Sequence, residues 1–212
     1  MDDRCVIFYD SGIGGRHAFH KAKERFPSEN FLYFSDTKNM PYGNRSEGEL
    51  ASIFNKNLEI LSSFCPKAVV FACNTISVTF PYAEIRGGVK IFRVFPVLPQ
   101  GKKTLLLATR ATAESGYVRN AIKDRKDVVV LPLGRLARDI EEGRGETSED
   151  WKRIDGAGKD FETVSLGCTH YRILEKKFRE KFPGAEIADG MDETMERLVG
   201  FLEKEPHSAR GV

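Results

Sequence analysis

Short apolar runs rich in β-branched and aromatic residues alternate with helical patterns along the chain. Runs of this kind are typical of buried strands, and their alternation with helices predicts mostly parallel sheets covered on their faces by helices. The sequence therefore predicts an α/β fold, with strands at 5–9, 31–34, 68–72, 104–108, 128–131 and 163–166.

Two segments carry the apolar stripe of an amphipathic helix. The first predicts a helix at about 47–64, opened by Ser46 with Glu49 three residues later as a capping box. The second predicts a last helix at 191–202 that packs back on the body of the protein. In contrast, the polar, glycine-containing stretch 144–160 has no sustained period, which predicts a mobile or poorly ordered connection with Trp151 as its one anchor.

An internal repeat divides the chain into two related halves. AVVFACNT (68–75) and TVSLGCTH (163–170) share a strand that ends in a small residue, a cysteine and two polar residues. CVIFYDSGIGG (5–15) and TLLLATRATAES (104–115) are both apolar strands that lead into polar loops. A boundary at about 94–101, where prolines and a glycine cluster, fits a division into two pseudo-symmetric α/β domains.

The net charge and the lengths of the apolar runs argue against nucleic-acid-binding, membrane and secreted proteins. With 212 residues, 33 Lys and Arg, and 31 Asp and Glu, the net charge is only +2, so neither a nucleic-acid partner nor an anionic membrane is expected. No apolar run approaches the roughly 20 residues of a membrane span, and MDDRC at the amino terminus does not resemble a secretory leader. We expect a cytoplasmic protein.

The four cysteines are too few and too unevenly spaced for a disulfide framework, and no CxxC pair indicates zinc. Cys73 and Cys168, however, both follow predicted strands, where helix amino termini favour thiolate over thiol. His170 adds a titratable neighbour. One such cysteine is most often a small buried hydrophobic residue, but two in matching contexts favour a functional role.

If the halves face each other, a substrate between them has one sulfur on each side. One thiolate could then remove a proton from one face of a carbon while the other thiol returns a proton to the opposite face, which is racemisation. The two sulfurs should titrate as a coupled pair, because one must be charged while the other is neutral.

Polar residues at the other strand ends suit an amino-acid substrate. Asp10 and Ser11 lie beside a glycine turn, and side chains at 74, 75 and 169 can cap helices or hold an ammonium or carboxylate group. The turn of Tyr42 and Gly43 would expose backbone N–H groups that could bind a second carboxylate. Each feature alone is more often a plain turn or cap, so only their convergence favours a site.

Together these motifs resemble the glutamate racemase family. The matching segments follow the family's order: DSGIGG (10–15), PYGNRS (41–46), ACNT (72–75), TRATAESG (109–116) and GCTHY (167–171). The resemblance implies a cofactor-independent enzyme, without a metal, that interconverts L- and D-glutamate and supplies D-glutamate for peptidoglycan. It implies an active site between two domains, which we expect at 1–95 with 188–212 and at 96–187.

The resemblance also implies roles for individual residues. Cys73 and Cys168 correspond to the acid/base thiols, and Asp10 and His170 to the residues that assist them. The substrate-binding positions correspond to Ser11, Tyr42, Gly43, Asn74, Thr75, Thr112 and Thr169. An acidic residue that assists the second thiol could be Asp139, Glu141 or Glu142, and the sequence does not choose among them. Arg172 departs from the family, which usually has proline there.

Three alternatives remain open at this stage. A racemase of another amino acid such as aspartate would use the same thiols, and an inactive relative would bind an amino acid without turning it over. A dinucleotide-dependent oxidoreductase would use Gly12, Gly14 and Gly15 after the first strand and Asp36 after the second, although His17 stands in place of the third fingerprint glycine. The sequence also leaves open whether the protein forms a homodimer.

Overall fold

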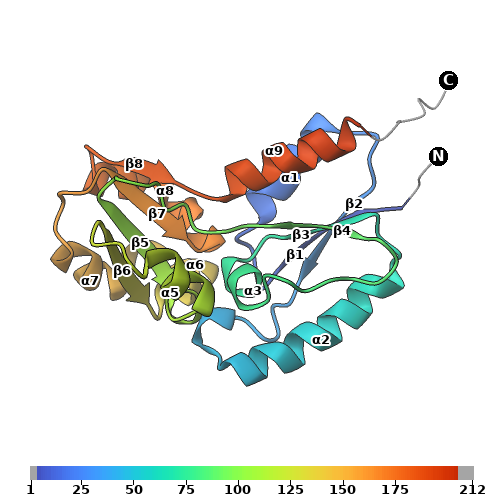
Figure 1. Cartoon of the computed structure of the whole chain (residues 1–212), viewed down its shortest axis with the longest axis horizontal. Helices are drawn as coiled ribbons and strands as arrows, with labels where there is room; N and C mark the ends of the chain where they lie inside the picture. The colour runs from blue at the N-terminus through green and yellow to red at the C-terminus, as the bar shows by residue number, and fades with distance from the viewer. Residues whose placement is uncertain (1–3, 205–212) are drawn as a thin grey trace.

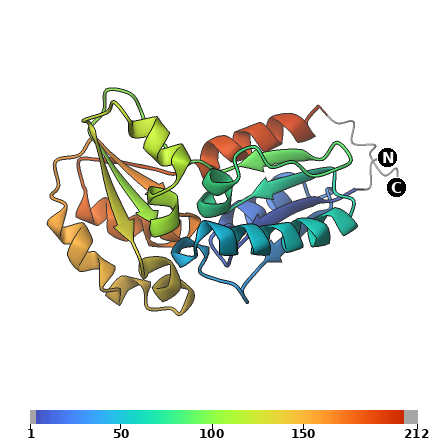
Figure 2. The same ribbon diagram turned by 60° about the horizontal axis from the view of Figure 1, so that its bottom comes forward.

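The structure, a computed structural model, describes residues 4–204 and contains two four-stranded parallel sheets (Figures 1 and 2). The first sheet has the order β2-β1-β3-β4 and is made of β1 (Val6–Asp10), β2 (Phe31–Ser35), β3 (Ala68–Phe71) and β4 (Lys90–Arg93). The second has the order β6-β5-β7-β8 and is made of β5 (Thr104–Thr109), β6 (Val128–Leu133), β7 (Thr163–Gly167) and β8 (Glu186–Ala188). The predicted α/β class is confirmed.

Both sheets repeat the same strand order, which confirms the pseudo-symmetry that the internal repeat predicts. Strands β1 and β5 take equivalent central positions, as do β3 and β7. All the strand pairs within the sheets are parallel, with Val6 opposite Ala68 in the first sheet and Thr104 opposite Thr163 in the second. The carboxyl ends of β1 and β3 therefore lie at one edge of their sheet, and those of β5 and β7 at one edge of theirs.

Helices cover both faces of each sheet (Figure 1). The first half has α1 (Arg16–Arg25) and α9 (Met191–Leu202) on one face, with α2 (Glu47–Ser63) and the short α3 (Asn74–Thr79) on the other. The second half has α6 (Leu136–Glu141), α7 (Asp150–Gly156) and α8 (Glu175–Lys181) on one face and α5 (Gly116–Ile122) on the other. Shorter helical segments are α4 (Arg110–Ala113) and the 3₁₀ helices η1 (Tyr42–Asn44), η2 (Gly145–Thr147) and η3 (Thr169–Leu174).

Alternation of side chains along the central strands explains this layering. Val6 and Phe8 of β1 point into the core beneath α1 and α9, whereas Ile7 and Tyr9 point into the core beneath α2. Residues of β1 and β3 on both faces are fully buried, which is why these strands read as continuous apolar runs in the sequence.

The two predicted helices are confirmed. Ser46 Oγ accepts from the Glu49 backbone N–H while the Glu49 side chain accepts from the Ser46 N–H, which is the expected capping box of α2. The last helix α9 packs Met191 and Leu198 into the core of the first half. The predicted domain limits, 1–95 with 188–212 and 96–187, remain a proposal, and their ends at 1–3 and 205–212 lie outside the described residues.

The prediction of a mobile connection at 144–160 is wrong. This stretch contains η2 and α7, because side chains of the segment bind the rest of the second half. The Asp150 carboxylate accepts from the backbone N–H groups of Arg135 and Leu136, at 2.7 and 2.8 Å. Trp151, the expected anchor, donates its indole N–H to Gly145 O and packs on Phe178. The absence of a local hydrophobic period gave the wrong prediction because long-range contacts order the segment.

The two halves touch tightly where η1 meets the end of β5. Gly43 is buried, and a Cβ atom at this position would collide with the side chain of Thr109 from the second sheet. Gly48, in the first turns of α2, is exposed and has open space around the corresponding position. The two glycines therefore differ in whether a side chain can be tolerated.

Replacing these glycines by alanine tests the contact between the halves. Gly43→Ala should lower the free energy of unfolding by about 1–3 kcal/mol because the added methyl group overpacks the interface. Gly48→Ala, the matched control, should leave it unchanged or raise it by up to about 1 kcal/mol because alanine favours the helix. Urea denaturation measures both values, and equal stability of the two variants would contradict the observed contact.

Candidate active site

The predicted site residues gather at the carboxyl edges of the two sheets. Asp10 is the last residue of β1, and Cys73 follows the neighbouring strand β3 as the N-cap of α3. Cys168 follows β7 as the N-cap of η3, beside Thr109 at the end of β5. In open parallel sheets this edge is where ligands bind.

The two edges face each other, since hydrogen bonds cross from one half to the other. Thr169 Oγ1 donates to Asp10 Oδ2 at 3.2 Å, and the Ile13 N–H donates to Glu141 Oε1 at 2.6 Å. Thr75 Oγ1 lies 3.1 Å from Thr109 Oγ1 and 3.2 Å from Thr112 Oγ1. The structure thus brings Cys73, Cys168, Asp10, His170, Ser11, Asn74, Thr75, Thr112 and Thr169 to one interface, next to Tyr42 and Gly43 of η1.

The Asp10 carboxylate holds the glycine turn after β1 in place. It accepts from the N–H groups of Gly12 at 3.0 Å and Gly15 at 2.7 Å, and from the Thr169 hydroxyl. Burial raises the pKa of Asp10, while the charge of His170 and these donors act in the opposite direction. Asp10 therefore links both halves through a buried carboxyl group.

Cys73 is a buried thiol held in its neutral form. Its Sγ lies 3.9 Å from Ser11 Oγ, and its side chain is almost fully enclosed. Burial raises the pKa of Cys73 to about 12, with a further contribution from the charge of Asp10 and one from Cys168. The expectation that a helix amino terminus favours the thiolate is wrong for Cys73, because desolvation and a neighbouring carboxylate outweigh the short helix α3.

Cys168 has different neighbours. Its Sγ lies 3.8 Å from His170 Nδ1, and His170 Nε2 lies 2.6 Å from Glu141 Oε1. Burial lowers the pKa of His170, but the hydrogen bonds to Cys168 and Glu141 outweigh it and raise that pKa to about 10. The ring is therefore an imidazolium at neutral pH, which places a positive charge beside the Cys168 sulfur.

Glu141 is the one of the three candidate acids that contacts His170. Asp139 instead accepts from Ser148 Oγ at 2.6 Å, and Glu142 forms an ion pair with Arg144. Burial raises the pKa of Glu141, but hydrogen bonds from His170 and the Ile13 N–H outweigh it and keep that pKa below its usual value. Sequence spacing could not select Glu141, because Asp139 is buried on the same short helix.

The side chain of Tyr42 is committed to a buried network in the first half. Its hydroxyl donates to Asp36 Oδ2 at 2.6 Å, and Asn57 Nδ2 donates to Tyr42, Asp36 and Tyr9 at 3.0 Å each. The pKa of Asp36 is lowered, because these hydrogen bonds and those from Asn39 outweigh the effect of its burial. What Tyr42 can offer a ligand is therefore its backbone.

Sequence reasoning missed this network. The available signal was Asn57, a polar residue three positions after Phe54 and four before Leu61 on the buried stripe of α2. A buried amide on an apolar helix face requires hydrogen-bond partners, which here are the phenol of Tyr42 and the carboxylate of Asp36.

Unused hydrogen-bonding capacity lies beside Cys73. Asn74 Oδ1 is buried and has no hydrogen-bond partner among the residues that the structure describes. The neighbouring hydroxyl groups of Thr75, Thr109 and Thr112 bond to one another, and Thr109 Oγ1 also accepts from the Thr112 backbone N–H at 3.4 Å. Hydroxyl groups can turn to a new acceptor. This combination suits a ligand with ammonium and carboxylate groups.

The glycine turn does not have the free space that a dinucleotide needs. A Cβ atom on Gly12 would collide with Glu141, and one on Gly14 would collide with Thr169 and His170. Asp36, the candidate ribose-binding acid, already accepts hydrogen bonds from Tyr42, Asn57 and Asn39. Side chains of the second half thus occupy the positions where a pyrophosphate would approach the backbone.

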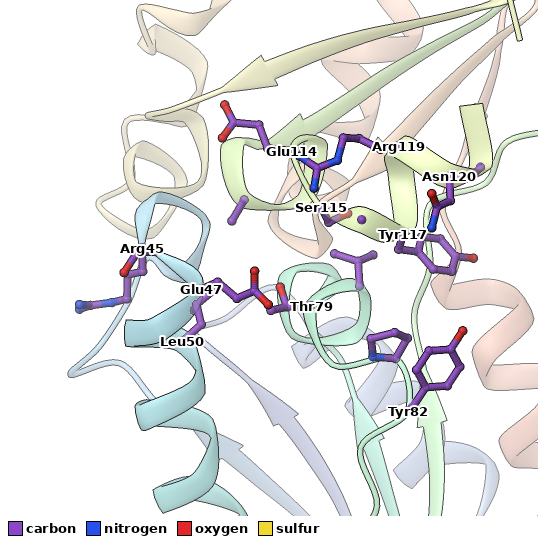
Figure 3. Close-up of a pocket in the computed structure, with 16 residues that line it drawn as sticks. Arg45, Glu47, Leu50, Thr79, Tyr82, Glu114, Ser115, Tyr117, Arg119 and Asn120 are labelled. Carbon is purple, nitrogen blue, oxygen red and sulfur yellow. The ribbon is translucent and has the colours of Figure 1, made fainter. Parts of the chain in front are cut away.

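A cavity of about 970 Å³ lies between the halves (Figure 3). The start of α2, the loop after α3 and the segment from α4 to α5 line it, with Glu47, Tyr82 and Arg119 among the lining residues. Neither thiol lines this cavity, so it is distinct from the site at the strand ends.

Residues 4–204 contain neither a membrane-spanning helix nor a cluster of metal ligands. No helix there combines the length and the apolar character that crossing a bilayer requires. The same residues contain no group of three or more His, Cys, Asp or Glu side chains arranged to hold a metal ion.

The relatives and the solved structures that resemble this chain are compared in sequence and in fold. No protein-family model matches the chain. A glutamate racemase of Clostridium botulinum is 31% identical over 214 residues, which cover 93% of this chain and 83% of the relative. The chain therefore matches most of the length of a curated enzyme.

Solved structures of similar fold include further glutamate racemases. The glutamate racemase of Francisella tularensis in complex with D-glutamate superposes with a TM-score of 0.80 at 25% identity, covering 96% of this chain and 82% of that one. The Escherichia coli glutamate racemase in complex with L-glutamate and the activator UDP-MurNAc-ala gives 0.77 at 26% identity, covering 99% and 86%.

The raised pKa of His170 predicts how stability depends on pH. A histidine with a folded-state pKa of about 10 contributes stability that is fully present below its unfolded pKa of roughly 6.5 and is lost as pH rises toward 10. Between pH 7 and 8.5 the free energy of unfolding should therefore fall by about 1.4 kcal/mol per pH unit from this group.

Urea denaturation of His170→Gln over the same pH range isolates this contribution. The variant should be less stable at pH 7 but should show a flatter dependence, because glutamine carries no titrating proton. His20→Gln, on the exposed surface of α1, is the control and should keep the wild-type slope. A wild-type slope in His170→Gln would mean that folding gives no net proton to the pair of His170 and Cys168.

Proposed function

This chain belongs to the glutamate racemase family, whose members are amino-acid racemases, and we propose that it interconverts L- and D-glutamate with two cysteine thiols and no cofactor. The observation that carries the mechanism is the pair of buried thiols, each following the equivalent strand of one half. The charge of Cys168 contributes to the raised pKa of Cys73, which supports a shared site for the two sulfurs.

Racemisation requires that a proton leave one face of Cα and that another arrive on the opposite face. In the proposed reaction the Cys168 thiolate takes the Cα proton, so that the C–H bond breaks and an S–H bond forms. The Cys73 thiol then gives its proton to the other face of the carbanion and becomes the thiolate. The reverse reaction starts from this second protonation state, so the two sulfurs exchange roles with direction.

The different neighbours of the two sulfurs support this starting state. Cys73 is neutral because of burial and the carboxylate of Asp10, while the His170 imidazolium lies beside the second sulfur, with Nδ1 3.8 Å from Cys168 Sγ. Glu141 holds that imidazolium through Nε2 and keeps Nδ1 directed at the sulfur. In this account Asp10 and His170 assist the thiols, as the resemblance implies, and Glu141 orients His170.

We assign the remaining polar groups to the substrate. Asn74 Oδ1, which lacks a partner in the described part of the chain, suits the ammonium group. The hydroxyl groups of Thr75, Thr112 and Thr169, with Ser11, suit the α-carboxylate, and the backbone of Tyr42 and Gly43 suits the side-chain carboxylate. The relatives crystallised with D- and L-glutamate support glutamate as the ligand.

The cellular role follows from the product. We propose that the D-glutamate is used for peptidoglycan synthesis in the cytoplasm and that the enzyme binds neither nucleic acid nor membrane. The Escherichia coli relative, which has UDP-MurNAc-ala as an activator, supports the link to cell-wall synthesis. Expression of this chain should restore growth of a strain that requires D-glutamate, whereas Cys73→Ser should not.

Circular dichroism of L- and D-glutamate solutions tests the mechanism. Cys73→Ser and Cys168→Ser should each lower the rate of racemisation by about 10²- to 10⁴-fold, since each removes one of the two proton-transfer groups. Cys65→Ser is the matched control and should keep wild-type activity, because this thiol is exposed and precedes β3, at the edge of the sheet opposite the carboxyl ends of the strands. Full activity in either active-site variant would overturn the two-thiol mechanism.

Parallel measurements separate the remaining functions. Turnover in D₂O should introduce deuterium at Cα, as proton exchange through thiols requires. Faster racemisation of L-aspartate than of L-glutamate would replace the proposed substrate. Glutamate binding by calorimetry without any change of optical signal, in protein whose thiols are reduced, would identify an inactive binding protein instead.

A further inference from the structure

Three side chains among residues 169–172 hold the segment that follows the second thiol, Cys168. Thr169 donates to Asp10 in the first half, and His170 contacts Glu141 in α6. Arg172, on the same 3₁₀ helix η3, reaches in a third direction toward the start of α9. The proposed mechanism uses the first two contacts but gives Arg172 no part.

Arg172 bridges two carboxylates at the junction of β8 and α9. Its Nη1 lies 3.0 Å from Asp192 Oδ2 and 3.5 Å from Asp189 Oδ2, and its Nε lies 3.7 Å from Glu175 Oε2. The Asp189 side chain is 4% exposed, and its Oδ2 has no hydrogen-bond partner in residues 4–204. The guanidinium is thus the cation that compensates a buried carboxylate.

The helix that receives this contact is fixed to the other half. Met191 and Leu198 of α9 pack into the core beneath the first sheet, and Thr194 Oγ1 donates to the carbonyl oxygen of Arg93 at the end of β4. Figure 1 shows α9 lying along α1 on that face. Asp192 stands in the first turn of the same helix, so its position is set by the first half.

We propose that Arg172 is a positioning residue, which ties the Cys168 segment to α9 and so sets the distance of the second sulfur from the first half and Cys73. This inference rests on the proposed racemase function. Because two protons must be transferred on opposite faces of one carbon, a small displacement of one sulfur lowers the rate; a misplacement of about 1 Å can cost on the order of 10²-fold.

A positioning role affects the two proton transfers unequally. The two enantiomers have equal free energy, so kcat/KM must stay equal in both directions in every variant. Isotope effects are free of this constraint. If proton transfer to and from Cys168 becomes slower, the deuterium isotope effect on kcat/KM, measured with substrate deuterated at Cα, should rise for the enantiomer that Cys168 deprotonates. For the other enantiomer, which Cys73 deprotonates, the same isotope effect should fall.

The variants Asp192→Asn, Arg172→Met and Arg172→Lys test this, with Arg179→Met as control. Asp192 is exposed, so Asp192→Asn removes the charge from the link to α9 while Arg172 still compensates Asp189. Asp192→Asn and Arg172→Met should lower kcat/KM by about 10- to 100-fold with divergent isotope effects, and Arg172→Lys should restore part of the rate. Arg179→Met, which breaks an exposed pair with Glu175 on α8, should match wild type.

The outcomes separate the two claims. Equal isotope effects for both enantiomers in a slow Asp192→Asn variant, or wild-type kinetics in it, would overturn the positioning role while leaving the racemase function intact. A wild-type protein that turns over neither enantiomer would instead overturn the proposed function. In that case alkylation of the thiols, followed by mass spectrometry, decides the positioning role: the ratio of Cys168 to Cys73 labelling should change in Asp192→Asn and not in Arg179→Met.

Discussion

A buried carboxylate, Asp10, joins the two halves of this protein at the place where their strands end. It holds the turn after β1 through two backbone N–H groups and accepts the hydroxyl of Thr169 from the opposite half. Burial is the main cause of the raised pKa of Cys73, and the charge of Asp10 adds to it. The same charge adds to the hydrogen bonds with Cys168 and Glu141 that raise the pKa of His170. Asp10 therefore acts on both sides of the proposed division of labour between a neutral thiol and a thiolate.

The fold could be predicted where strands are buried on both faces. The strands β1, β3 and β5 read as nearly continuous apolar runs because helices cover them on both sides. Two short edge strands, β4 (KIFR) and β8 (EIA), were not predicted, since half-exposed strands of this length carry little pattern. The helix α7 was missed for another reason: contacts of Asp150 and Trp151 with distant parts of the second half order it.

The composition of the site was more predictable than its electrostatics. Strand ends and the internal repeat pointed to Cys73 and Cys168, and the resemblance added Asp10 and His170 as the residues that assist them. The choice of Glu141, the commitment of the Tyr42 hydroxyl to Asp36 and the raised pKa of Cys73 all depend on which groups are enclosed together. Desolvation depends on how the folded protein packs. The expectation that a helix amino terminus favours a thiolate at Cys73 does not account for the free energy of removing that charge from water.

The central claim is geometric: the sulfurs of Cys73 and Cys168 flank one carbon atom of the substrate from opposite sides. A crystal structure of the protein with D-glutamate bound tests it most directly. The account predicts that Cα lies between the two Sγ atoms, with its hydrogen directed at one of them. A glutamate whose Cα approaches only one sulfur, or which binds in the cavity lined by Glu47, Tyr82 and Arg119, would contradict the account.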